Sequence, residues 1–246
     1  MVVNAVNESE QNVSWARQYK SQKAKLMNSQ IIRRCFSRVA LIFFLVNIGT
    51  AYATNDAETW VVLGDSISAG YGIPDGQGWV ALFQEKLNAS DYSINITNES
   101  ISGDTTAGGL ARLPEVLERL TPDVVIIELG GNDGLRGLSL KAMEDNLSKM
   151  IALCQSRDIR VLLLGMKIPP NYGRKYGELF ESVFTSVAKQ HKVGLLPFLL
   201  DGVGGYQEYM QNDRVHPNSD AQKMLVDNVW GFVGPVLNAR VGVEKI

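Results

Sequence analysis

Short runs of branched apolar residues, separated by longer stretches with helical periodicity, are the feature that most limits how this chain can fold. The clearest runs lie in Trp60–Leu63, Asp123–Leu129 and Arg160–Leu164. A strand that faces water on one side alternates apolar and polar residues, whereas an almost uninterrupted apolar strand is covered on both faces. Because helices would supply that cover, the pattern predicts a parallel sheet between two helical layers.

The order of these segments predicts an α/β domain: a three-layer αβα sandwich, as in flavodoxin-like folds, with a central, mainly parallel sheet of about five strands. Two further strands are expected, at Ile94–Asn98 and within Val193–Leu200. The expected helices are Trp79–Leu87, Ala111–Leu120, Ser139–Arg157, Tyr176–Lys192 and Asn218–Val236. No linker or internal repeat divides residues 54–246, so we expect them to form a single domain.

The first 53 residues have the pattern of an export signal. Arg33, Arg34 and Arg38 precede the apolar run Val39–Ile48, and Ala51-Tyr52-Ala53 follows it. A charged segment, a short apolar segment and a small-x-small site are typical of a secretory signal peptide. The apolar run is too short for a spanning helix, which needs about 20 residues. An uncleaved membrane anchor is the alternative.

We therefore expect cleavage after Ala53 and an exported protein, periplasmic or secreted, without a stable membrane anchor once processed. Met27 would begin a signal peptide of ordinary length, so translation from Met1 and from Met27 both stay open. The surroundings of Arg33 only partly match a twin-arginine signal, which favours the Sec route. Cleavage would also remove Cys35 and leave Cys154 as the single cysteine, so no internal disulfide could form.

The distribution of charge argues against nucleic acid as a partner. The chain has 24 Lys or Arg and 26 Asp or Glu, but seven of the basic residues and only two of the acidic ones lie in residues 1–53. The remaining chain is therefore acidic, with a net charge of about −7. Proteins that bind the nucleic-acid backbone present a basic surface, and the sequence has no basic stripe that would form one.

Three polar clusters follow the expected strands at their carboxyl ends. They are Gly64-Asp65-Ser66, Ser102-Gly103-Asp104 and Gly130-Gly131-Asn132-Asp133. Ligands of open α/β sheets bind at this edge, so we expect the clusters to meet there. Each cluster taken alone is also compatible with an ordinary turn, since Gly, Asp, Ser and Asn are common turn residues.

A histidine beside one of these serines would make the edge a hydrolytic site, because a serine hydroxyl is a weak nucleophile until a base takes its proton. The chain has two histidines. His191 lies at the end of an expected helix, where a solvated residue is the simpler interpretation. His216 follows Asp213 by three residues in a turn closed by Pro217, a spacing that can place the carboxylate beside the imidazole Nδ1. The alternative is an aspartate helix cap beside an unrelated surface histidine.

Taken in order, four blocks resemble the signature of the SGNH (GDSL) hydrolase family: Gly64-Asp65-Ser66, Ser102-Gly103, Gly130–Asp133 and Asp213–Pro217. The similarity covers nearly the whole chain after the export signal and is closest to the periplasmic multifunctional thioesterase I/protease I/lysophospholipase L1 type. It implies Ser66 as the nucleophile, with His216 and Asp213 as its relay. It also implies Gly103 and Asn132 as oxyanion donors beside the Ser66 N–H.

Members of the resembling group cleave fatty acyl thioesters, lysophospholipids and aryl esters, so the resemblance implies a serine esterase or thioesterase. Apolar and aromatic residues in two loops of the same edge are candidates for lining an acyl groove: Leu135, Leu138, Ile168, Tyr172 and Tyr176. A carbohydrate deacetylase is the alternative on the same fold. A nucleotide- or flavin-binding module is a distant alternative, since Gly70-Tyr71-Gly72 lacks the third glycine of a dinucleotide site. We expect no cofactor, no metal, a small-molecule or lipid ester as substrate, and a monomer.

Overall fold

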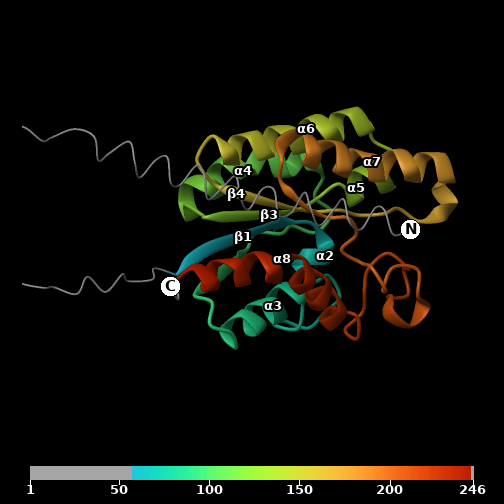
Figure 1. Ribbon diagram of the computed structural model, residues 1–246. Coiled ribbons are helices and arrows are strands. Elements are labelled where there is room, and N and C mark those ends of the chain that lie inside the picture. Colours follow the sequence, from blue (N-terminus) through green and yellow to red (C-terminus); the bar gives the residue numbers. More distant parts are fainter. Residues whose placement is uncertain (1–56, 245–246) are drawn as a thin grey trace, which may run out of the picture. The chain divides into compact units, whose positions relative to one another are not determined.

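A five-stranded sheet with the strand order β2-β1-β3-β4-β5 forms the centre of the fold (Figure 1). The computed structural model describes residues 57–244, so the predicted export signal lies outside the described residues. The strands are β1 (Glu58–Gly64), β2 (Ile94–Asn98), β3 (Val124–Glu128), β4 (Arg160–Leu164) and β5 (Gly194–Leu196). All neighbouring strands pair in parallel, so every strand ends at the same edge of the sheet.

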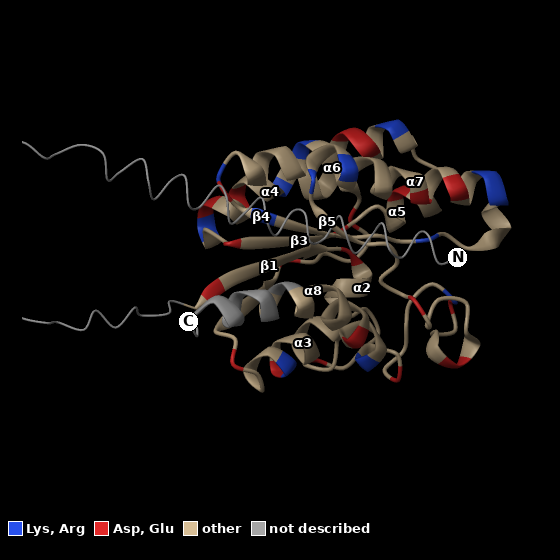
Figure 2. Ribbon diagram, viewed as in Figure 1, with Lys and Arg blue, Asp and Glu red and all other residues tan. Residues whose placement is uncertain are grey.

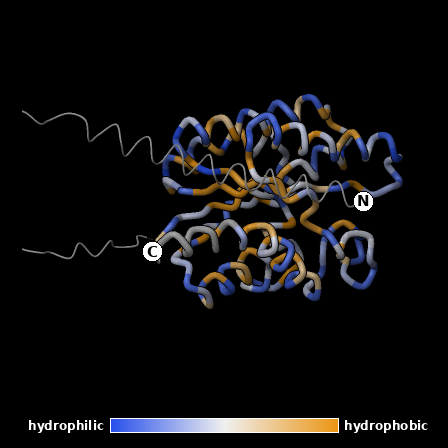
Figure 3. The backbone as a smooth tube through the Cα atoms, in the orientation of Figure 1, coloured by the Kyte–Doolittle hydropathy of each residue, from blue (hydrophilic) through white to orange (hydrophobic). Residues whose placement is uncertain are grey.

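The central strands are buried, as their composition predicts. Every residue of β3 is buried, and so are the residues of β1 from Trp60 to Gly64. β2 lies at the edge of the sheet, and only its first residue, Ile94, is buried. Figure 3 shows the hydrophobic segments gathered along the sheet between the two helical layers. The uninterrupted apolar runs therefore form the core, whereas the edge strand accepts polar residues.

Helices cover both faces of the sheet (Figure 1). α3 (Trp79–Asn88) and α8 (Gln222–Glu244) pack together on one face. α4 (Thr106–Leu120), α6 (Leu140–Gln155) and α7 (Arg174–His191) cover the other face. In the view of Figure 2, acidic and basic residues are interspersed on both helical layers. The predicted three-layer αβα fold is confirmed.

Aromatic rings fill the interface between α3 and α8. The rings of Phe83 and Trp230 have centroids 6.3 Å apart, and the Lys86 ammonium lies 5.1 Å from the Trp230 ring. On the opposite face, Cys154 of α6 is fully buried, and burial raises the pKa of its thiol to about 12. Among the described residues, no helix combines the length and the apolar character that a membrane span requires.

α4 begins at Thr106, earlier than the predicted start at Ala111. Gly108 and Gly109 disfavour a helix in isolation, so the sequence before Ala111 has little helical signal. Both glycines are needed for close packing: a Cβ on Gly109 would lie 2.3 Å from Leu129 Cδ1, and one on Gly108 would lie 1.9 Å from Asp104 Oδ1. The helix therefore contacts the residue that follows β3 and the loop that precedes α4.

Two short helices at the carboxyl edge were not predicted. α2 (Ser66–Ala69) directly follows β1, and α5 (Gly131–Leu135) follows β3. Both are too short to show helical periodicity in the sequence. Short 3₁₀ helices also occur at η1 (Pro170–Tyr172) and η2 (Gln207–Tyr209).

The strand order fixes where these two short helices lie. β2 pairs with one side of β1 and β3 with the other, so the chain changes direction across the sheet at β1. Ligands of open α/β sheets bind at such a switch point, beyond the carboxyl ends of the strands. α2 and α5 are the segments that leave the two strands at this point.

Candidate active site

Ser66 begins α2 at the carboxyl end of β1. Asp65 caps this helix, since its Oδ1 accepts a hydrogen bond from the Ile67 N–H at 3.0 Å. Gly64 leaves no room for a side chain, because a Cβ there would lie 2.7 Å from Ser68 Cβ. The chain can therefore turn sharply from strand to helix and leave the Ser66 side chain half-buried at the edge. The first N–H groups of a helix have no acceptor within it, so the Ser66 N–H is open to a substrate atom.

The Ser66 hydroxyl contacts His216, although the two residues are 150 positions apart in the sequence. His216 Nε2 lies 2.8 Å from Ser66 Oγ, and His216 Nδ1 lies 2.7 Å from Asp213 Oδ2. The fold thus brings the three predicted residues into one hydrogen-bonded series. An unrelated surface histidine, the alternative left open by the sequence, does not fit these contacts.

Both carboxylate oxygens of Asp213 are in use. Oδ2 contacts the His216 ring, and Oδ1 accepts hydrogen bonds from the N–H groups of Val215 and His216 at 2.9 and 3.0 Å. Burial by itself raises the pKa of Asp213, but these hydrogen bonds and the charge of His216 outweigh it and lower the pKa to about 2. Asp213 is therefore ionised at neutral pH and favours a proton on His216 Nδ1, which leaves Nε2 free to accept one from Ser66.

Gln211 fixes the loop that carries His216. Its backbone N–H donates to the His216 carbonyl at 2.8 Å, and its Nε2 donates to the carbonyls of Tyr71 and Pro217 at 2.8 and 3.0 Å. The Tyr71 ring lies beside the imidazole, with centroids 4.6 Å apart. The histidine loop is thereby joined to the segment that follows α2, on the Ser66 side of the site.

Asn132 lies near Ser66 because α5 leaves β3 next to β1. Its Nδ2 donates to Asp65 Oδ2 at 3.0 Å, which places the carboxamide beside the turn that holds the serine. The next residue, Asp133, is buried and accepts hydrogen bonds from the Thr106 N–H and hydroxyl at 2.9 and 2.6 Å. α5 is therefore joined both to the Ser66 turn and to the start of α4.

Gly103 lies in the loop between β2 and α4 and has a φ of 80°, where glycine is favoured. Arg112 of α4 holds this loop against the sheet. Its Nε donates to Asp104 Oδ2 at 2.8 Å, and its guanidinium also reaches the carbonyls of Glu99 and Gly64 at the ends of β2 and β1. The loop with Gly103 and the turn with Ser66 therefore share one support.

Comparison with known proteins places most of the chain in one family. Residues 62–224, which include all four blocks, match the GDSL-like Lipase/Acylhydrolase family. The chain belongs to this family. The resemblance inferred from the four blocks is thus confirmed.

Individual relatives of this GDSL-like acylhydrolase cover most of its length. Esterase TesA of Pseudomonas aeruginosa is 50% identical over 181 residues, which are 74% of this chain and 90% of the relative. Thioesterase 1/protease 1/lysophospholipase L1 of Escherichia coli is 38% identical over 195 residues, 79% of this chain and 92% of the relative. The crystal structure of the psychrotrophic esterase EstA from Pseudoalteromonas sp., inhibited by monoethylphosphonate, has a TM-score of 0.71 and 40% identity, and covers 74% of this chain and 99% of that one.

Two buried carboxyl groups support the Ser66 turn of the acylhydrolase. Glu128, at the end of β3, is fully buried, and its Oε2 accepts hydrogen bonds from Ser68 Oγ at 2.7 Å and from the Asp65 N–H at 3.4 Å. Burial raises the pKa of Asp65 to about 6, against the lowering effect of its hydrogen bonds from Ile67 and Asn132. Burial and the negative charge of Asp65 raise the pKa of Glu128 well above its usual range. Burial and repulsion between the two carboxylates therefore favour a proton on Glu128.

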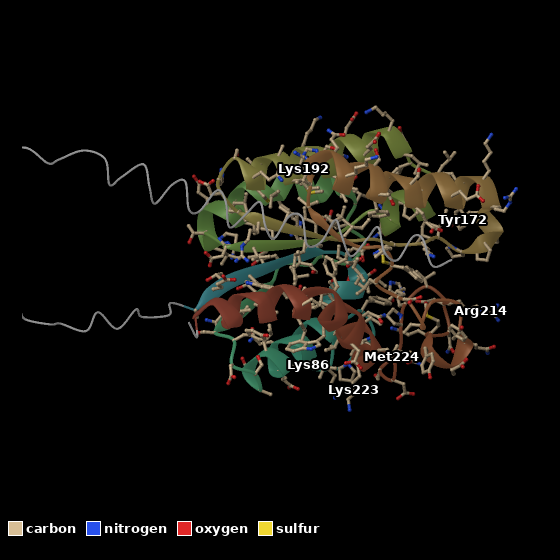
Figure 4. All side chains as sticks on the ribbon, viewed as in Figure 1. Lys86, Tyr172, Lys192, Arg214, Lys223 and Met224 are labelled. Atoms are coloured by element: carbon tan, nitrogen blue, oxygen red, sulfur yellow. The ribbon has the colours of Figure 1, made fainter. Side chains whose placement is uncertain are left out.

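The predicted groove residues come together beside α5. The Tyr172 hydroxyl donates to the Leu135 carbonyl at 2.9 Å, and the Tyr176 hydroxyl donates to the Gly134 carbonyl at 3.1 Å. Ile168 packs on the same turn, since a Cβ on Gly134 would lie 2.8 Å from Ile168 Cγ2. Leu138, just beyond α5, is exposed. Figure 4 shows Tyr172 at the same end of the described residues as Arg214, which lies next to Asp213. A role of these five residues in binding substrate stays a prediction.

Several supporting residues were missed by the sequence analysis. Gln211 and Arg112 belong to no recognisable pattern, and only the fold brings them to the site. Glu128 did carry a signal, since an acidic residue in an otherwise apolar strand is buried and needs polar partners. The other histidine, His191, ends α7 and accepts a hydrogen bond from Gln155 at its carbonyl, away from the carboxyl edge. Among residues 57–244, no three His, Cys, Asp or Glu side chains form a cluster that could hold a metal ion.

Proposed function

We propose that this GDSL-like acylhydrolase is an exported serine esterase and thioesterase that forms an acyl-enzyme on Ser66. The observation that supports this most strongly is the contact of Ser66 Oγ with His216 Nε2 at 2.8 Å, continued by His216 Nδ1 and Asp213 Oδ2 at 2.7 Å. A nucleophile, a base within hydrogen-bond reach and an acid that orients the base are the groups that nucleophilic acyl transfer requires. The names of the relatives, an esterase and a thioesterase/lysophospholipase, agree with this chemistry.

The reaction starts when Ser66 Oγ attacks the acyl carbonyl carbon while His216 Nε2 takes the hydroxyl proton. Negative charge then develops on the carbonyl oxygen, where the N–H groups of Ser66 and Gly103 and the Asn132 amide stabilise it. As the bond to the leaving group breaks, His216 gives its proton to the departing alcohol or thiol. Water attacks the acyl-enzyme with His216 again as base, and the release of the acid restores Ser66.

Exposed apolar side chains around the site favour fatty acyl and aryl substrates. Six large hydrophobic side chains of the described residues have between 40% and 54% of their surface exposed, and one of them, Leu179, lies in α7. The other five lie in the segments that directly follow the strands: Tyr71 after β1, Ile101 after β2, Leu138 after β3, Tyr172 after β4 and Tyr206 after β5. Contacts of this kind stabilise a hydrocarbon chain by removing it from water. We therefore propose aryl esters, fatty acyl-CoA and lysophospholipids as substrates, with a carbohydrate deacetylase as the alternative.

Replacing the nucleophile tests the mechanism. Ser66→Ala should lower kcat by about a millionfold, as in other triads that lose their serine, with the melting temperature unchanged. A fluorophosphonate should label wild-type protein at Ser66 and fail to label this variant. Ser182→Ala is the matched control, because Ser182 lies exposed on α7 and its hydroxyl donates only to the Leu179 carbonyl of the same helix. Substantial turnover by folded Ser66→Ala protein would contradict the proposal.

Acyl chain length tests the substrate class. Each methylene that enters an apolar groove contributes about 0.8 kcal/mol, which is nearly fourfold in kcat/KM. With p-nitrophenyl esters, kcat/KM should therefore rise steadily from acetate toward medium chains until the groove is full. A deacetylase has a closed acyl pocket and would lose activity as the chain grows. A steep preference for acetate over octanoate would favour this alternative.

A further inference from the structure

Arg136 contacts the two segments that contain the proposed oxyanion donors Gly103 and Asn132. It follows α5 directly, and its guanidinium NH2 group donates to the Gly103 carbonyl at 2.8 Å. The same nitrogen lies 3.4 Å from Asn132 Oδ1. Gly103 lies in the loop after β2, and Asn132 lies in α5, after β3. The Arg136 side chain contacts both residues.

These contacts also fix which way the Asn132 carboxamide points. Its Nδ2 donates to the Asp65 carboxylate at 3.0 Å, and its Oδ1 faces the Arg136 guanidinium. The reverse orientation would turn the oxygen toward a carboxylate and the N–H₂ toward a cation, and both contacts would be repulsive. One N–H of Nδ2 is bound to Asp65, so the second N–H is the one left to donate to a substrate oxygen.

We propose that Arg136 is a positioning residue for the oxyanion donors, which holds the Gly103 loop and the Asn132 carboxamide in the geometry that the tetrahedral intermediate requires. The inference rests on the proposed function, in which these two residues stabilise the oxyanion. Arg112 holds the Asp104 end of this loop, but Gly103 itself has no side chain, and the preceding residues Ile101 and Ser102 are exposed. A fixed donor contributes more than a mobile one, because no reorganisation is needed as charge develops.

The effect of Arg136 on kcat should be smaller than the effect of an oxyanion donor itself. Removal of one oxyanion donor lowers kcat by about 10²–10³-fold. Arg136 acts through two such donors but is exposed, so water can partly replace its contacts. We expect Arg136→Met to lower kcat about tenfold with p-nitrophenyl butyrate and to leave KM within about twofold.

A double-mutant cycle with Asn132→Ala tests this. If Arg136 acts partly through Asn132, Arg136→Met should lower kcat less in the Asn132→Ala background than in the wild type. The rate at which a fluorophosphonate labels Ser66 should fall in parallel, since that reaction also builds charge on an oxygen at the site. Arg157→Met is the matched control, because Arg157 is exposed in the turn before β4, at the opposite edge of the sheet, and should leave kcat unchanged.

The outcomes separate the inference from the function on which it rests. If Asn132→Ala keeps full kcat, the proposed donor role fails first. If Asn132→Ala is impaired but Arg136→Met is as fast as wild type, or the two effects multiply fully, the positioning role is wrong. A rise in KM alone would also overturn it, because Arg136 would then bind substrate rather than support the donors. Melting temperatures of the variants, compared with Arg157→Met, identify any loss of kcat that is due to unfolding.

Discussion

Asp213 uses its two carboxylate oxygens for different purposes. Oδ1 accepts two backbone N–H groups and fixes the turn, while Oδ2 contacts His216 Nδ1 and fixes the ring. These hydrogen bonds outweigh burial and hold the pKa of Asp213 at about 2, so the group stays ionised well into the acid range. A single side chain therefore sets both the conformation of the loop and the tautomer of the histidine.

These two purposes can be separated by substitution. In Asp213→Asn, the amide oxygen can still accept the backbone N–H groups, but the N–H₂ faces His216 Nδ1 and forces the ring proton onto Nε2, toward Ser66. We expect kcat to fall by up to about 10⁴-fold while the melting temperature stays close to that of the wild type. Asp213→Ala should lose activity and also melt earlier, because the turn loses its acceptor. Equal activity of Asp213→Asn and wild type, measured with p-nitrophenyl esters, would show that Asp213 does not orient His216.

The principal residues of the site could be found from the sequence because the chemistry leaves few choices. A nucleophilic serine needs a base, which in such triads is a histidine. The chain has two histidines, and one of them follows an aspartate by three residues. Residues that only hold the site loops in place are not limited to particular side-chain chemistry in this way. Arg136 and Gln211 contact backbone carbonyls of distant segments, and any long polar side chain at those positions would look the same in the sequence.

At the scale of elements, β3 carries a polar group in the most buried part of the sheet. Glu128 ends this strand, is fully buried, and contacts Ser68 and the Asp65 N–H. Its pKa is raised far above the ordinary value of 4.5 by burial and by the charge of Asp65. The folded chain therefore keeps a proton that the unfolded chain releases, so this group makes the fold less stable as pH rises above about 4.5.

Glu128→Gln should remove this dependence, because glutamine keeps the shape and does not ionise. We expect the melting temperature of the variant, relative to wild type, to increase as the pH rises above about 4.5 and to level off where Glu128 ionises in the fold. Glu115→Gln is the control, since it makes the same chemical change on the exposed side of α4. A difference between Glu128→Gln and wild type that stays constant across this range would mean that Glu128 is already ionised in the fold.

The elements themselves were predictable where burial decided the pattern. β4 begins and ends at the predicted residues, because its apolar run has polar neighbours that mark its ends. The edge strand β2 also has the predicted bounds, but there the alternation of apolar and polar residues is the signal. The start of α4 was predicted too late, since Gly108 and Gly109 are required by contacts with residues distant in the sequence or in the preceding loop. α2 and α5 were missed because one helical turn is too short to show a period, although both hold residues of the site.

At the scale of the whole molecule, the strand order explains why four distant blocks make one site. The parallel pairing carries every strand to the same edge, and the change of direction at β1 places the segments after β1 and β3 side by side. The sequence predicted the class of fold but not the order of the strands in the sheet. The order of the strands depends on which helix crosses which face, and that is decided by packing between segments.

The predicted export signal lies outside the described residues and stays a prediction. Ala51 and Ala53 are the small residues that follow the apolar run, and β1 begins at Glu58, shortly after them. Cleavage after Ala53 would therefore leave every strand and helix described above intact. Intact-mass measurement of the exported protein should find Thr54 at the amino terminus. A mature protein that still contains Phe43 would show that the segment is kept as an anchor.

The position of Cys154 has a practical consequence for the study of thioesters. Cys154 is the one thiol within residues 57–244, it is fully buried in α6, and its pKa is raised to about 12. A thiol reacts with disulfide reagents as the thiolate and only when a reagent can reach it. If cleavage removes Cys35 with the export signal, a disulfide reagent that releases a coloured thiol should report the coenzyme A set free from a thioester, without a background reaction or inactivation at Cys154.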